Sequence, residues 1–244
     1  MIQVINLHKR FGDHHVLKGI SLEVEAGTTC VILGGSGSGK TVMMKHMIGL
    51  LKPDSGQVIV EGEDIVPLES DELARVRKKF GMVFQAAALF DSMTVYENVS
   101  FPLREHTKLK EDAIRQLVRE KLEIVGLRNV EHKYPADLSG GMRKRVGLAR
   151  AIVLNPKIVL YDEPTTGLDP ITTDYVDEMI LDAKRKLGVT SVVISHDIAS
   201  AFKVADKIAF LHQGHIVEEG PPEQLRNSEH PAVRVFLQTW FGKN

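Results

Sequence analysis

The most chemically specific stretch of this sequence is residues 34–41, Gly-Gly-Ser-Gly-Ser-Gly-Lys-Thr. It matches the pattern G-x-x-x-x-G-K-[ST], in which a glycine-rich loop turns several backbone N–H groups toward phosphate. The apolar run 29–33 before it indicates a buried strand, and apolar residues at helical spacing from 43 to 51 predict a helix after it. The loop should therefore lie at a helix N-terminus, where the helix dipole favours anions.

Two side chains of this loop have specific chemistry. Lys40 supplies a positive charge for the β- and γ-phosphates of a nucleotide, and the hydroxyl of Thr41 can ligate Mg²⁺. The other residues bring backbone N–H groups to phosphate, and glycine permits the required curvature. The candidate phosphate-binding residues are Gly34, Gly35, Ser36, Gly37, Ser38, Gly39, Lys40 and Thr41.

A second apolar run, residues 158–161, ends in two carboxylates, Asp162 and Glu163. A carboxylate at a strand end can hold Mg²⁺ directly or through water, so Asp162 is a candidate metal ligand. Glu163, one residue further on, could activate a water beside the γ-phosphate as a general base. An apolar strand followed by two acids is common, and the assignment depends on the phosphate-binding loop in the same chain.

Two more polar side chains follow apolar runs that favour strands. Gln85 follows residues 80–84, and His196 follows residues 191–195. Since the carboxyl ends of parallel strands meet at one edge of a sheet, both should lie at the edge that holds Asp162. His196 could bond the γ-phosphate or fix the attacking water, although a lone histidine is usually structural.

A second potential anion site follows Leu138. Ser139 is a good helix N-cap, and Gly140 and Gly141 would let a ligand approach the backbone closely. The helix after them carries four basic residues, which could form a nucleic-acid patch. On a chain with a net charge of −1, we expect a solvated helix face instead. The four residues are Arg143, Lys144, Arg145 and Arg150.

Residues near the N-terminus leave two questions open. Phe11 could stack on an adenine ring through an exposed π-face, or it could simply pack against its neighbours, and its position alone does not decide. His14 and His15 are adjacent, as in some metal sites. No third ligand is near them in the sequence, so a solvated pair is expected.

Composition indicates an ordinary globular protein. Of the 244 residues, 43% are hydrophobic and 26% are charged, which suffices for a sizeable core. The net charge of −1 does not favour a nucleic-acid binder. The single cysteine, Cys30, excludes an intramolecular disulfide and suits a buried strand. There is no signal-peptide pattern and no run of eighteen apolar residues, so any membrane role should come through a partner.

The order of elements predicts an α/β fold. Segments 2–5 and 21–25 show partial β alternation on either side of a turn, and 58–60 is a further strand. Residues 86–150 change to helical character, which suggests a helical subdomain inserted into an α/β core. At the C-terminal end, an apolar stripe at helical spacing more often packs on the chain's own core than docks to a partner. The stripe comprises Val233, Phe236, Leu237, Trp240 and Phe241.

Spacing predicts three further elements. Apolar positions between 114 and 125 indicate an amphipathic helix over 111–127. A similar pattern from 176 to 187 indicates a helix that ends at Gly188. Two short runs, 207–211 and 215–219, indicate a strand pair.

Together these motifs resemble the ATP-binding subunits of ABC transporters over essentially the whole chain. The phosphate-binding loop, Gln85, the signature-like run 138–142, the acidic pair, Asp169 and His196 occur in that family's order and spacing. The resemblance implies ATP and Mg²⁺ as cofactors, Gln85 as a metal ligand and catalytic residue, and Phe11 as the adenine-stacking aromatic. The family signature usually has Gln as its fifth residue, where this chain has Met142, but the serine and both glycines are kept.

The resemblance also implies an architecture. It is a P-loop ABC ATPase with a RecA-like parallel-sheet core, an N-terminal antiparallel β subdomain and an inserted helical subdomain. We expect residues 1–244 to form one ATP-binding domain. The core with its β subdomain should occupy 1–85 and 151–228, the helical subdomain 86–150, and a C-terminal helix 229–244.

Three segments look more specifically like the Mla/Mce-type lipid-trafficking ATPases: residues 88–107, Met142, and the run Asp-Pro-Ile-Thr at 169–172. This resemblance implies a homodimer bound to two copies of an integral-membrane, MlaE-like permease, with phospholipid as the cargo. A lipid-binding Mce-domain protein would lie across the membrane, and some relatives also bind a small STAS-domain protein. The subunit would then sit at the cytoplasmic face of the inner membrane, held there by the permease.

In the expected cycle, ATP binds Phe11 and the loop of one subunit together with residues 139–141 of the other. Closure of this sandwich lets Glu163 activate water, and hydrolysis reopens it. Closure would act on the permease through residues 86–107, with Leu89 as an apolar docking residue.

Three alternatives remain beside this reading. An ABC importer ATPase for another small solute would keep the same catalytic residues. A soluble nucleic-acid ATPase of the superfamily is less favoured, because Lys40 and Ser139 are only 99 positions apart, too close for a long coiled coil, and one cassette is present. A non-hydrolysing nucleotide switch is disfavoured by Glu163.

Overall fold

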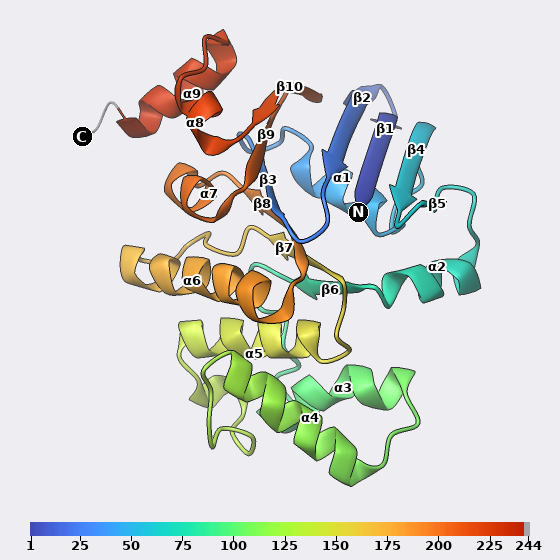
Figure 1. Cartoon of the computed structure of the whole chain (residues 1–244), viewed down its shortest axis with the longest axis vertical. Coiled ribbons are helices and arrows are strands. Elements are labelled where there is room, and N and C mark those ends of the chain that lie inside the picture. Colours follow the sequence, from blue (N-terminus) through green and yellow to red (C-terminus); the bar gives the residue numbers. More distant parts are fainter. Residues whose placement is uncertain (242–244) are drawn as a thin grey trace.

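The computed structural model describes the backbone of residues 1–241 and the side chains of residues 1–238. In this part of the chain the larger sheet has six strands in the order β10-β9-β3-β8-β7-β6, all paired in parallel except β10 with β9 (Figure 1). This sheet confirms the expected α/β class. Its strands are β3 (Thr29–Leu33), β6 (Phe80–Val83), β7 (Ile158–Asp162), β8 (Thr190–Ser195), β9 (Lys207–His212) and β10 (His215–Gly220).

Within the same described residues, four strands form a smaller antiparallel sheet in the order β2-β1-β4-β5. The first hairpin is longer than segments 2–5 and 21–25 suggested, since Phe11 pairs with His14 across a two-residue turn in which Gly12 has a φ of 57°. Its outer half is largely exposed, so the apolar alternation that marks a strand fades there. The strands are β1 (Ile2–Phe11), β2 (His14–Val24), β4 (Ser55–Val60) and β5 (Glu63–Asp64).

Helices α3, α4 and α5 lie between β6 and β7 in the chain and form a group on the side of the molecule away from the antiparallel sheet (Figure 1). Three short helices, α2, α7 and α8, were not expected, because eight residues or fewer give too little periodicity to detect. The helices are α1 (Lys40–Met47), α2 (Ser70–Arg77), α3 (Val95–His106), α4 (Glu111–Ile124), the 3₁₀ turn η1 (Pro135–Asp137), α5 (Gly140–Ile152), α6 (Pro170–Leu187), α7 (Ile198–Val204), α8 (Pro222–Arg226) and α9 (Pro231–Phe241).

Capping residues set the ends of the longer helices. The carboxylate of Asp169 accepts hydrogen bonds from the first N–H groups of α6, and Gly188 ends that helix in a left-handed conformation, as expected. Gly126 has a φ of 72° just after α4. Helix α1 ends at Met47 rather than near residue 51, because Gly49 turns the chain with a φ of 65°.

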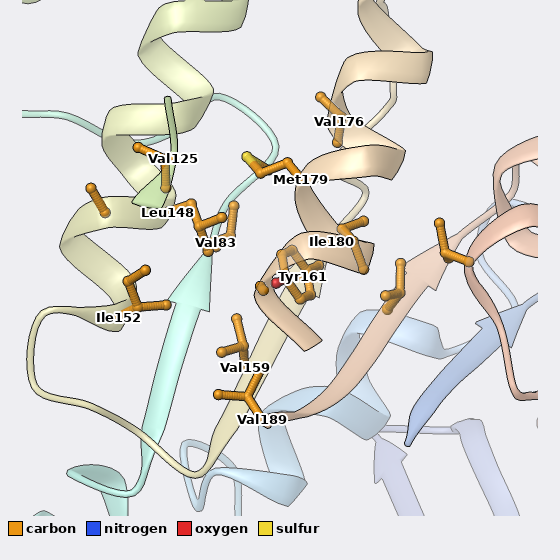
Figure 2. Packing of buried hydrophobic residues seen from close by; sticks show 14 of the residues in the cluster. Val83, Val125, Leu148, Ile152, Val159, Tyr161, Val176, Met179, Ile180 and Val189 are labelled. Carbon is orange, nitrogen blue, oxygen red and sulfur yellow. The ribbon is translucent and has the colours of Figure 1, made fainter. Parts of the chain in front are cut away.

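Apolar side chains form two clusters, and successive residues of the six-stranded sheet belong to opposite ones. Figure 2 shows one cluster, where α5 and α6 pack over β6 and β7. Each fully buried aliphatic side chain contributes about 1.5–3 kcal/mol, so this packing fixes where both strands end relative to α5. Residues labelled there include Val83, Leu148, Ile152, Val159, Tyr161 and Ile180.

The C-terminal helix α9 packs on the chain's own core. The ring of Phe236 meets Phe210 edge-on, with centroids 5.0 Å apart. This confirms the expected packing for the first part of the apolar stripe, whereas the side chains of Trp240 and Phe241 lie outside the described residues. The buried members of the stripe are Val233 and Leu237.

Cys30 is buried, and burial raises the pKa of its thiol to about 12, so it behaves as the expected small core residue. No helix in the described part of the chain is long and apolar enough to cross a membrane. The proposed subdomain boundaries near residues 85, 150 and 228 stay a prediction.

Candidate active site

The phosphate-binding loop lies between the end of β3 and the start of α1, as expected. Gly39 precedes the helix with a φ of 108°, and a Cβ there would come within 2.9 Å of Leu17 Cδ2. A Cβ at Gly34 would lie 2.3 Å from the carbonyl oxygen of Leu211. Glycine is therefore required at both positions, because β2 and β9 confine the path of the loop.

The side chain of Lys40 is buried and folds back over the loop. Its Nζ donates to the carbonyl oxygens of Gly34 and Gly35, at 2.9 Å in each case. The same ammonium lies 3.5 Å from Oε1 of Glu163. Lys40 thus connects the loop with the acid that follows β7.

Thr41 and Asp162 meet at the same edge of the sheet, where Thr41 Oγ1 donates to Asp162 Oδ1 at 3.4 Å. Burial raises the pKa of Asp162, and the Thr41 hydroxyl partly opposes that shift. These two oxygens are hard ligands that suit Mg²⁺, and a divalent cation would offset the cost of burying the carboxylate. No group of three or more His, Cys, Asp or Glu side chains placed to hold a metal exists among the described residues. Thr41 and Asp162 would supply two ligands to such an ion, and phosphate and water would supply the others.

Glu163 has a left-handed backbone with a φ of 50°, which is uncommon for a residue that carries a side chain. Its N–H donates to the carbonyl of Ile194 at 3.0 Å. Its Oε2 accepts a hydrogen bond from Thr166 Oγ1 at 2.8 Å and lies 2.6 Å from Nδ1 of His196. Such a conformation costs of order 1–3 kcal/mol and persists where neighbours fix it, as functional sites often do. The structure holds this carboxylate in one orientation.

Three predicted site residues are thus in contact, Lys40 with Glu163 and Glu163 with His196. Lys40 follows the loop after β3, Glu163 follows β7 and His196 follows β8. The parallel order β3-β8-β7 brings the ends of these three strands together. The direct contact between Glu163 and His196 was not expected from the sequence. Thr166 was not singled out either, although a hydroxyl three residues after an acid in a turn is a signal that could have indicated it.

Gln85 makes no such contact. Strand β6 ends at Val83, so Gln85 lies in the following turn and not at the strand end that the sequence suggested. Ala87 and Ala88 in that turn have left-handed φ values of 61° and 47°. Gln85 is exposed and, among the side chains that the structure describes, it has no hydrogen-bond partner. Its role as a metal ligand and catalytic residue stays a prediction.

Ser139 caps α5 as expected, and its Oγ accepts a hydrogen bond from the N–H of Met142 at 3.2 Å. A Cβ at Gly140 would meet no atom within 4 Å, so this helix N-terminus is open on that side. Within residues 1–238, no side-chain hydrogen bond joins Ser139 to the phosphate-binding loop, and Gly140 and Gly141 make none either. One chain therefore presents two separate glycine-rich helix N-termini.

The expectation of a solvated basic face on α5 is wrong for most of its residues. Lys144 is buried and donates to the carbonyl of Pro164. Arg150 is only partly exposed and donates to two carbonyls of the turn after β6, at 2.8 Å each. Arg145 is also partly exposed, which leaves Arg143 as the exposed member. Helix α5 packs against α3, α4, β6 and α6, so little of its circumference faces water.

The ring of Phe11 is 49% exposed and has Nζ of Lys9 at 5.6 Å from its centroid. Core packing does not account for Phe11, and a free π-face is what adenine stacking would require. His14 is exposed, whereas a ring nitrogen of His15 lies 3.4 Å from one of His8. Desolvation lowers the pKa of His15, which favours a neutral ring.

This chain is similar to known proteins in sequence and in structure. The profile of the ABC transporter family matches residues 17–166, which is more than half of the chain. The probable ribonucleotide transport ATP-binding protein mkl of Mycobacterium tuberculosis is 47% identical over 97% of this chain and 66% of its own length. The intermembrane phospholipid transport system ATP-binding protein MlaF of Haemophilus influenzae is 42% identical over 98% of this chain and 90% of its own length.

Solved structures agree with these sequence matches. The ATP-binding cassette MJ0796, solved as a dimer in a post-hydrolysis state with ADP and Pi, superposes with a TM-score of 0.81. It is 32% identical and covers 91% of this chain and 99% of its own. This chain spans about two thirds of the length of the mkl proteins and most of the length of MlaF.

Proposed function

The chain belongs to the ABC transporter family of ATP-binding proteins, and we propose that it powers phospholipid transport through a membrane permease. It is an ATP hydrolase with the cassette fold of that family. The observation that carries the mechanism is the contact of Glu163 with both Lys40 and His196. This cluster puts a phosphate-binding loop and a fixed carboxylate at one place.

The residues of the loop at 34–41 would bind the nucleotide phosphates, with Lys40 placed to meet the β- and γ-phosphates. Phe11 would stack on the adenine through its exposed face. Thr41 and Asp162, together with Gln85, would hold Mg²⁺, whose charge offsets that of the phosphates.

Glu163 would act as the general base toward the attacking water. Its Oε2 is engaged by Thr166 and His196, which leaves Oε1 on the side of Lys40 and the loop. A positioned base of this kind contributes roughly 10²–10⁴ to turnover. His196 would keep the carboxylate oriented at the rim of the site.

We propose that the working unit is a homodimer. Within one chain, Ser139 and the glycines after it have no hydrogen bond to the described phosphate-binding loop, although their open helix N-terminus suits an anion. A second copy placed head to tail would bring its residues 139–141 to the phosphates bound at 34–41. The similar cassette MJ0796 was solved as a dimer, which supports the proposal that this chain also works as one.

A groove of about 510 Å³ between α2, β6, α3 and α5 is the proposed permease contact. It is largely apolar, and Phe90 on its wall is 44% exposed. Leu89, which the sequence suggested as the docking residue, packs instead against the chain's own core. A permease segment seated here would hold the subunit at the cytoplasmic face of the inner membrane. Residues around the groove include Arg77, Phe80, Phe84, Phe90, Phe101 and Arg150.

Phospholipid is the proposed cargo because the segments 88–107 and 169–172 and Met142 match the lipid-trafficking subfamily, and MlaF covers almost the whole chain. A Mce-domain protein, and in some systems a small STAS-domain protein, would complete the complex. The name of the mkl relatives gives ribonucleotides as the competing cargo.

The test is purification of the subunit with its native permease and associated proteins, followed by lipid extraction and nucleotide analysis of the same sample. Co-purifying phospholipid, and ATP hydrolysis that changes when defined phospholipid is added, would support the proposal. Bound ribonucleotide other than ATP and ADP, or a soluble solute-binding partner without lipid, would overturn the cargo assignment and leave the ATPase assignment intact.

A further inference from the structure

Lys144 is a buried cation that has no carboxylate partner among the residues the structure describes. Its exposed fraction is 7%, and its Nζ donates to the carbonyl of Pro164. No ion pair reaches it from any side chain in the described part of the chain. Burial lowers the pKa of the Lys144 ammonium. Since an ammonium is costly to bury without a counter-charge, packing alone is a poor reason for a lysine at this position of α5.

The acceptor of this hydrogen bond lies in the segment that sets the position of Glu163. Pro164 directly follows Glu163, is buried, and has no N–H of its own. Among the described residues, its carbonyl has Lys144 as its hydrogen-bond partner and no other. A buried carbonyl without a partner is destabilising, so removing the ammonium would release this peptide group.

The Pro164 carbonyl lies one residue beyond a strained residue. Glu163 keeps its left-handed φ of 50° between a backbone hydrogen bond to Ile194 on one side and Pro164 on the other. Thr166, whose hydroxyl holds Oε2 of Glu163, comes two residues after Pro164. A shift of Pro164 would therefore change both the backbone and the hydrogen bonding of the carboxylate.

We propose that Lys144 is a positioning residue for Glu163. From α5 it holds the carbonyl of Pro164 and thereby fixes the turn that directs the carboxylate toward the phosphate-binding loop. Ser139 is the N-cap of the same helix, so a movement of the proposed second anion site would reach Glu163 through this hydrogen bond. The proposal rests on the proposed role of Glu163 as the general base.

The test is ATP hydrolysis by the full chain carrying Lys144→Met, which keeps an unbranched side chain one atom shorter and removes the donor. We expect turnover to fall roughly 10- to 100-fold, as displaced catalytic groups do, with the KM for ATP within about twofold of wild type. Lys144→Arg keeps a donor and should therefore retain most of the wild-type turnover. Lys121→Met is the matched control, because Lys121 is 3% exposed on α4 and pairs with Glu120 away from the site.

A double variant separates this proposal from the proposed function. If Lys144 acts through Glu163, then Lys144→Met added to Glu163→Gln should lower turnover by no more than about twofold further. The positioning role would be overturned by any of three results. They are a further 10- to 100-fold loss of turnover in the double variant, a rise in the KM of Lys144→Met as large as its fall in turnover, and wild-type turnover of Lys144→Met. Normal hydrolysis by Glu163→Gln would instead refute the general-base assignment, whatever Lys144→Met does.

Discussion

At the scale of single residues, Glu163 combines a strained backbone conformation with a carboxylate next to a second acid. Its neighbour Asp162 carries a carboxyl whose pKa is raised by burial and, to a smaller extent, by the charge of Glu163 itself. Lys40 is the cation that lies nearest to the pair, 3.5 Å from Oε1 of Glu163. Lys45 and Lys40 both lower the pKa of Asp162 and so offset part of this negative charge, and an added divalent cation would relieve the remaining repulsion. This arrangement of charges would suit the proposed metal–nucleotide complex.

Glu163→Gln tests the general base. The amide keeps the shape of the side chain and can still accept the hydrogen bond from Thr166, but it cannot take a proton. Turnover should fall by roughly 10²–10⁴ while the affinity for ATP stays near wild type. Steady-state phosphate release and equilibrium nucleotide binding, measured on the same preparation, would check both halves. A variant that lost binding and turnover together would show that Glu163 supports the fold of the site and not the chemistry.

Most candidate residues can be identified from the sequence, because each lies at a predicted strand end or in a loop that a short sequence motif defines. Their contacts do not follow in the same way. The hydrogen bond from Thr166 to Glu163, and that from Lys144 to Pro164, depend on how turns fold and on which helix packs beside them. For Gln85 the sequence suggested a position that the structure does not have. Strand β6 ends two residues before it, and the chain has turned away from the strand by the time it reaches Gln85.

At the scale of elements, β3, β7, β8, β9 and α6 were predictable, because each is a continuous apolar run or a long periodic one. The short helices α2, α7 and α8 were not, because tertiary packing and caps decide elements of that length. The β1–β2 hairpin was underestimated for a related reason. Pairing with a neighbour keeps a strand extended through Phe11 even where both of its faces are exposed.

The contact between α6 and α7 gives a pH dependence. Asp177 on α6 is buried and accepts a hydrogen bond from Ser200 on α7, and burial raises its pKa from 3.8 to about 6 against the smaller effects of Ser200 and Lys203. The folded state therefore binds this proton more tightly than the unfolded chain. The free energy of unfolding should fall as the pH rises from about 4 to about 6, and the full penalty applies above that range.

Asp177→Asn removes that penalty and should raise the free energy of unfolding at neutral pH by up to about 3 kcal/mol, with little gain near pH 4. Urea unfolding at both pH values would measure the difference. Asp182→Asn on the same helix is the control of opposite sign, because the hydrogen bond from Arg185 lowers the pKa of Asp182. A gain for Asp177→Asn that is the same at both pH values would point to packing and not to titration.

The groove beside α3 predicts a permease contact that can be broken without harming the nucleotide site. Phe90→Glu would place a carboxylate on a surface that the permease buries, beside Arg150, whose guanidinium carbon lies 5.9 Å from the Phe90 ring. Even with that neighbour, desolvating the charge in the interface costs several kcal/mol or separates the proteins. Co-purification with the permease should be lost while ATP binding by the subunit persists. Leu109→Glu is the matched control, since Leu109 has the same exposed fraction of 44% and does not line the groove. Retention of the permease by Phe90→Glu would place the contact elsewhere.

At the scale of the whole molecule, α5 connects the parts that must act together. Its N-terminus is the proposed second anion site, Lys144 donates to the turn after Glu163, and Arg150 donates to carbonyls of the turn beside the groove. A rigid helix with contacts at these three places can transmit a displacement of one to the others. In the proposed homodimer, the open N-terminus of α5 would bind a nucleotide held by the second chain.

Gly140→Glu tests that requirement at the N-terminus of α5. A Cβ at Gly140 meets no atom within 4 Å, and a carboxylate in the first turn is compatible with the helix dipole, so the variant should fold normally. It should also bind ATP at its own phosphate-binding loop, but its negative charge would repel the phosphates that a second chain presents. The measurement uses the Glu163→Gln background, in which ATP persists, and light scattering with ATP and Mg²⁺ should there show a dimer. Adding Gly140→Glu should raise the dissociation constant of that dimer by at least roughly tenfold, as expected for a lost anion contact. Lys110→Glu is the control for charge, because it places a carboxylate at the exposed N-terminus of α4, whose N-cap is Lys110, and lowers the net charge by 2 where Gly140→Glu lowers it by 1. If Gly140→Glu dimerises as well as this control does, residues 139–141 do not complete the site of a second subunit, and the homodimer would have to form through another face.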